Sequence, residues 1–133
     1  MLEDVAALEA SAEPVTVASL VRTIMAAFVA VYHRRPAFVQ IYLRGRTNPA
    51  VHDYGRRHNE QIARTLTDYA RQTGLAGPDL TDRKAQLAVE IGDRVFQLAF
   101  EHDDHGDADL VEEGMTMVTA YLERYAATPE ETP

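Results

Sequence analysis

The chain has 133 residues, the length of about one domain, and 46% of them are apolar, which excludes a disordered chain. It has no cysteine, which excludes disulfide bridges, thiol catalysis and cysteine-bound zinc and fits the reducing cytoplasm. The net charge is −8, with fourteen acidic against four basic residues after position 74, so we expect no nucleic-acid binding by this chain alone, because phosphate requires a dense basic face.

Proline and glycine divide the chain into segments of helical length. Residues 2–10 look like the end of a longer helix, and Pro14 breaks it. A second helix is predicted over residues 15–34, and its apolar residues cover more than one face. Arg22 and three hydroxyl residues interrupt the apolar run, so we interpret this segment as a buried helix and predict no membrane contact.

Pro36 ends that helix and favours a short one that closes near Gly45. Asn48 and Pro49 then predict the start of a long helix, because asparagine caps a helix and proline fits its first turn. Gly74 is typical of the left-handed residue that ends a helix. The buried stripe of this long helix is predicted to be Val51, Tyr54, His58, Ile62, Leu66 and Tyr69.

The last two helices are predicted from a cap at Asp79 or Thr81 to about residue 101 and over residues 108–126, with a turn at residues 77–79 before them and an acidic loop between them. The tail, residues 128–133, is expected to be disordered. No segment has a convincing strand pattern. The sequence therefore predicts an all-α fold, a single helical domain of about five to six helices.

The acidic loop invites a metal site, because two histidines three apart with carboxylates between them can bind zinc. Its place at a helix end beside Gly106 is equally typical of capping and solvation, and its spacing does not match a calcium loop. We therefore predict no metal at this cluster, which consists of His102, Asp103, Asp104, His105, Asp107 and Asp109.

No catalytic motif is found: there is no glycine-rich phosphate loop, nucleophilic serine turn or helical His-Glu-x-x-His. We predict that the chain is not an enzyme and takes no cofactor. The basic residues concentrate in one stretch that also contains Asp53 and Glu60, and we interpret it as a solvated face: Arg44, Arg46, Arg56 and Arg57.

Gly92 and Gly114 lie inside the last two predicted helices, where each costs about 1 kcal/mol relative to alanine. Their presence indicates that something packs close to the backbone there. Both helices carry wide apolar surfaces, so we predict that they pair with a second copy in a dimeric four-helix bundle. Use of both surfaces inside one chain is the alternative. The predicted interface residues are Leu87, Ile91, Gly92, Val95, Leu98, Val111, Gly114, Met115, Val118, Tyr121 and Leu122.

A set of large apolar residues falls on helices that should meet in the first part of the domain. They form either the core or, in part, the wall of a cavity for an apolar ligand. His58 is likewise either a core histidine or a polar anchor in such a cavity. The candidate ligand-binding residues are Met25, Phe28, Tyr32, Phe38, Tyr42, Tyr54, His58, Ile62, Phe96 and Phe100.

The order of these segments, with Tyr-His-Arg-Arg-Pro-Ala-Phe at residues 32–38 and Arg-His-Asn-Glu-Gln-Ile-Ala at residues 57–63, resembles the C-terminal regulatory domain of TetR-family repressors. The resemblance covers residues 1–127, of which residues 1–10 would be the remnant of a linking helix. It implies a ligand pocket among the earlier helices and a homodimer interface on the last two.

The helix-turn-helix of that family is missing from this sequence. The resemblance thus implies a small-molecule-sensing and dimerising domain, in which an apolar effector alters the DNA affinity of a separate DNA-binding part. The alternative function is a stand-alone helical module that binds another protein and no ligand.

Overall fold

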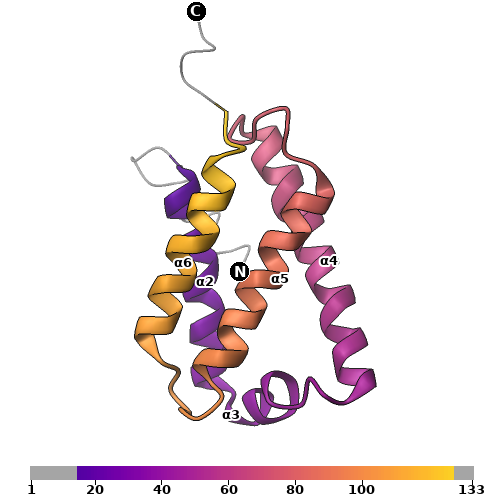
Figure 1. Ribbon diagram of the computed structural model, residues 1–133, viewed down its shortest axis with the longest axis vertical. Coiled ribbons are helices and arrows are strands. Elements are labelled where there is room, and N and C mark those ends of the chain that lie inside the picture. Colours follow the sequence, from indigo (N-terminus) through magenta and orange to yellow (C-terminus); the bar gives the residue numbers. More distant parts are fainter. Residues whose placement is uncertain (1–14, 128–133) are drawn as a thin grey trace, which may run out of the picture.

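The computed structural model describes residues 15–127 (Figure 1). In these residues the fold consists of five α-helices and one π-helix, with no strand, which confirms the all-α prediction. The expected helix remnant at residues 2–10 and the expected tail at residues 128–133 lie outside the described residues. The elements are α2 (Val17–Arg34), α3 (Pro36–Phe38), the π-helix η1 (Val39–Leu43), α4 (Pro49–Gln72), α5 (Asp82–Ala99) and α6 (Ala108–Glu123).

The helix starts are fixed by local capping. Thr16 and Ser19 form a reciprocal capping box at the start of α2, and the side chain of Asn48 accepts hydrogen bonds from the first turn of α4, as predicted. Thr81 and Asp107 cap α5 and α6 in the same manner. Because these bonds satisfy backbone N–H groups that have no partner within the helix, they determine where each helix begins.

The four long helices run up and down, and α3 and η1 close one end of the bundle (Figure 1). Helix α4 packs against α5, α5 against α6 and α6 against α2, so three sides of the arrangement are closed by direct helix contact. The other end holds the start of α2, the end of α6 and the turn from α4 to α5. The most deeply buried apolar side chains are Tyr32, Val39, Tyr42, Leu43, Ala63, Phe96, Ala99 and Phe100.

The predicted buried stripe of α4 is partly wrong. Tyr54 is 49% exposed, whereas Gly55, Asn59, Ala63 and Thr67 are buried. These four residues are spaced four apart and are small or polar, so they let α4 approach α5 closely. Ile62 and Leu66, the large apolar residues beside them, line a cavity between the helices.

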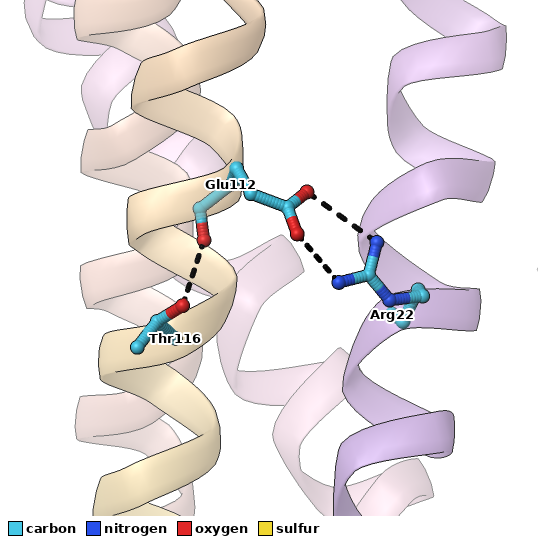
Figure 2. Close-up of polar contacts among 3 residues, drawn as sticks. All are labelled: Arg22, Glu112 and Thr116. Atoms are coloured by element: carbon cyan, nitrogen blue, oxygen red, sulfur yellow. Dashed lines mark hydrogen bonds and ion pairs between the residues drawn. The ribbon is translucent and has the colours of Figure 1, made fainter.

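By length and composition, α2 is the one helix of the described chain that could span a membrane, with 22% of its residues buried. It packs against α6, and the two helices are joined by Arg22 and Glu112, whose nearest nitrogen and oxygen atoms lie 2.6 Å apart (Figure 2). The guanidinium lowers the pKa of the Glu112 carboxyl by donating hydrogen bonds to it and by its charge.

Candidate functional site

A cavity of about 160 Å³ lies among the four long helices. This is close to the ~150 Å³ of an engineered apolar cavity that stays dry and takes up benzene. Most of its lining is aliphatic or aromatic, and it includes Ala88, Val89 and Leu66. Eight of the ten residues predicted to bind a ligand line it: Met25, Phe28, Tyr32, Phe38, Tyr42, His58, Ile62 and Phe96.

The other two predicted residues, Tyr54 and Phe100, are not among the lining residues. Tyr54 is half exposed and stacks on His58, with the ring centres 5.7 Å apart. Phe100 has no exposed surface, meets the edge of the Tyr32 ring at 5.2 Å and leaves no room for a side chain at Gly106, which has a φ of +83°. Phe100 is therefore a core residue in this structure.

A buried ion pair lies beside one end of the cavity, which one of its two partners lines. Asp93 of α5 lines the cavity, and its Oδ2 atom accepts hydrogen bonds from the Asn59 amide at 2.9 Å and from the Arg46 guanidinium at 2.7 Å. The Arg46 and Asp93 side chains are 10% and 6% exposed. The prediction of a solvated face is therefore wrong for Arg46, because a carboxylate 47 residues further along the chain pairs with it inside the fold.

Arg46 is held firmly in this position. Its guanidinium lies over the ring of Tyr42, 4.8 Å from the ring centre, and against Gly55, where any side chain would collide with it. Burial is the largest cause, and the charge of Asp93 the second, of a rise in the pKa of Tyr42 to about 12. The same two causes raise the pKa of Tyr32 by a larger amount. Both phenols at this end of the cavity therefore remain protonated at neutral pH and can donate hydrogen bonds.

The opposite end of the cavity is apolar, and it is lined by Leu75, Leu80 and Tyr125. Two backbone hydrogen bonds lie at this end: the amide of Gly77 donates to the carbonyl of Tyr125 at 2.8 Å, and the amide of Ala127 donates to the carbonyl of Leu75 at 3.0 Å. The chain therefore leaves the helical path after Glu123, three residues before the predicted end of the last helix.

The two helix-interior glycines have different surroundings within the single chain. At Gly114, an added Cβ would lie 2.5 Å from Cγ1 of Val95, so this glycine allows α5 and α6 of one chain to pack closely. Gly92 lines the cavity, and no atom outside its own helix backbone lies within 4 Å of the place where its Cβ would be. Gly92 thus enlarges the empty space.

The predicted dimer interface divides into an outer and an inner set. Leu87, Ile91 and Leu98 are 52%, 44% and 40% exposed on one face of α5. Two further exposed residues on α6, Leu110 and Met117, were not predicted. The members of the inner set lie in the core of the single chain, beside that core or at the cavity, so they do not form an outer face. They are Gly92, Val95, Val111, Gly114, Met115, Val118, Tyr121 and Leu122.

The acidic loop between α5 and α6 makes structural contacts. The carboxylate of Asp104 pairs with Arg44 at 2.8 Å, and the backbone carbonyl of His105 lies 2.6 Å from the Nε2 atom of His33. Asp107 caps α6. Within residues 15–127, no three or more His, Asp or Glu side chains are grouped as metal ligands would be.

Sequence reasoning missed Asn59, Asp93 and Arg46. Asn59 carried a signal, because it is a polar residue beside His58, a predicted inward-facing position of the long helix. Asp93 carried none, since Gly92 beside it was predicted to face a second copy. Arg46 carried none, since it lies in a turn between helices.

The family model described as tetracyclin repressor-like, C-terminal domain matches residues 16–122. This range begins at the cap of α2 and ends within α6. It includes all the residues that line the cavity except Tyr125 and Ala126. No curated protein and no solved structure matches the chain.

Proposed function

We propose a function for this chain from the premise that it belongs to the tetracyclin repressor-like C-terminal domain family. That family is regulatory and not enzymatic, and its domains typically bind effectors and form dimers. We infer that this domain senses an apolar small molecule and forms a homodimer, as the regulatory half of a cytoplasmic transcriptional repressor.

The observation that carries the ligand proposal is the empty volume beside Gly92. Protein interiors are normally packed as densely as organic crystals, and a void costs stability because its lining atoms lose contacts. Glycine in a helix interior adds a cost of its own, about 1 kcal/mol relative to alanine. A cavity of about 160 Å³ that a glycine enlarges is what a binding site requires, and a fold optimised only for stability would fill it.

The dimer proposal is supported by the exposed apolar residues of α5 and α6. Leu87, Ile91 and Leu98 recur at spacings of four and seven, and Leu110 and Met117 are seven apart, so each helix presents one apolar stripe to solvent. Exposed stripes of this kind are typical of helices that pair in a bundle.

In the proposed mechanism, the effector favours one packing of α4 and α5 around the cavity. The dimer face on α5 is rigidly connected to the cavity wall on the same helix, so the change is passed to the relative placement of two DNA-binding parts, which these residues do not include. Coupling between two sites of this kind is typically worth ~1–3 kcal/mol.

Thermal denaturation in the presence of a panel of apolar metabolites tests the ligand proposal. A binding compound raises the melting temperature in a concentration-dependent manner, because it stabilises only the folded state. The matched variant Gly92→Leu fills the cavity and should abolish the shift while the protein remains folded. A melting temperature that no compound moves would favour the alternative, a helical interaction module without a ligand.

The mass in dilute solution tests the dimer proposal. We expect twice the chain mass for the wild type and the single chain mass for Ile91→Glu, which places a charge in the apolar stripe of α5. Gln61→Glu, which adds the same charge at an exposed position of α4, serves as the control and should leave the dimer intact. A wild-type protein that remains a single chain would refute this part of the proposal.

A further inference from the structure

The polar end of the cavity is asymmetric in charge. Asp93 is the one carboxylate among the lining residues, and no lysine or arginine lines the cavity. The remaining polar lining groups there are the phenols of Tyr32 and Tyr42, the imidazole of His58 and the amide of Asn59. The cavity wall therefore offers a bound molecule one strong acceptor, a carboxylate, and no permanent cation.

The hydrogen bonds of Asp93 leave part of that acceptor unused. Both bonds, from Arg46 and from Asn59, go to Oδ2, and no hydrogen bond from residues 15–127 reaches Oδ1. An ionised carboxylate has about four lone-pair sites, and Oδ1 is not among the fully enclosed polar atoms that lack a partner, so it keeps some accessible surface for a further donor. A donor supplied from the cavity side would complete the set.

We propose that the molecule bound in this cavity is amphipathic and carries a hydroxyl, amide or ammonium group that donates a hydrogen bond to Asp93. Its apolar body extends toward Leu75, Leu80 and Tyr125 at the opposite end. This inference rests on the proposed function, since it specifies the chemistry of the ligand in the same cavity.

Two other ligand classes fit less well. An anionic group would meet the charge of Asp93, and Arg46 cannot compensate it from its place between the Tyr42 ring and Gly55, outside the cavity lining. A pure hydrocarbon would fill the apolar end but leave Oδ1 of Asp93 without a donor, in a site that binding has cleared of water.

Three probes with the same chain length separate these classes: octanol, its isomer heptyl methyl ether, and octanoate. Isothermal calorimetry on the full chain should show octanol binding about tenfold or more tightly than the ether, because a hydrogen bond to a charged acceptor is lost. Octanoate should bind more weakly than both. Equal affinities for octanol and the ether, or a preference for octanoate, would overturn the inference but leave the ligand proposal standing, whereas no binding by any probe would count against both.

A double variant assigns the preference to the ion pair. Arg46→Met combined with Asp93→Leu removes both buried charges together, so no unpaired charge remains to unfold the protein. It should still bind the ether, and the preference for octanol should disappear. The matched control, Arg22→Gln with Glu112→Gln, removes the exposed ion pair outside the cavity (Figure 2) and should keep the preference. If the cavity variant keeps it as well, Asp93 is not the acceptor.

Discussion

Helix α5 packs against α4 on one side and α6 on the other, and the two contacts are built differently. Toward α6 the contact is apolar and close, with Val95 seated on Gly114. Toward α4 it is polar, with Asn59 and Asp93 hydrogen-bonded beside a cavity. Close apolar packing resists small displacements because any movement opens a void or creates a clash. The α4 side of α5 is therefore the side that can adapt to a bound molecule.

Removal of the carboxylate on the α4 side should have the largest effect. Asp93→Ala leaves the Arg46 guanidinium buried without a partner, and we expect the free energy of unfolding to fall by about 3–5 kcal/mol. Urea denaturation measures this loss. The double variant Arg46→Met with Asp93→Leu should recover most of it, and a single variant as stable as the double one would contradict a buried ion pair.

The α6 side should respond to steric overlap. In Gly114→Ala, the new Cβ would lie 2.5 Å from Cγ1 of Val95, so the Val95 side chain or the helices must shift. We expect overpacking of about 1–3 kcal/mol to outweigh the gain of alanine in helix propensity and to lower the melting temperature. Adding Val95→Ala should relieve the overlap. A melting temperature that the added alanine does not raise would place the conflict elsewhere.

The same substitution on the cavity side should have the opposite sign. Gly92→Ala introduces a Cβ into open space, so only the gain in helix propensity remains, and the free energy of unfolding should rise by up to about 1 kcal/mol. The comparison with Gly114→Ala in one urea titration series cancels the propensity difference. If both alanines destabilise the protein equally, the two sides of α5 are not packed differently.

The smallest effect is expected on the contact between α2 and α6, which belongs to neither side of α5. Because the folded protein lowers the pKa of Glu112, the contribution of its ion pair is complete above the unfolded-state pKa and is lost as the pH falls through the folded-state value. Glu112→Gln should therefore reduce the melting temperature slightly at neutral pH and not at all in acid. Added salt should also shrink the difference.

The helices could be predicted from the sequence because their limits are set by nearby residues. Asn48 caps the start of α4, and Gly74, which lies just after the end of α4, has the left-handed φ of +75° that the sequence indicated. The π-turn of η1 and the early end of α6 depend on packing and on a backbone contact with residues 75–77, so no local pattern revealed them.

Eight of the ten residues predicted to bind a ligand do line the cavity, but the sequence did not predict that the space between them is empty. The pattern that placed Ile62 and Phe96 inward is the same for a filled core and for a cavity wall. Hydrophobic periodicity shows which way a side chain faces, but not how far it lies from the side chains opposite. The pairing of Arg46 with Asp93 joins residues 47 apart, and the contact of Gly114 with Val95 joins two helices of one chain. Which partner a face meets is decided by the assembled fold.

Two backbone hydrogen bonds form a clasp between residues 75–77 and residues 125–127, and this clasp bears on the rate at which a ligand enters and leaves the cavity. It joins two chain segments at the apolar end of the cavity by two amide–carbonyl bonds, those of Gly77 and Ala127, and the four bonded residues lie outside the four long helices. We therefore expect these two bonds to influence how fast a bound molecule exchanges through the apolar end of the cavity. Shortening the chain before Tyr125 would accelerate exchange through this end.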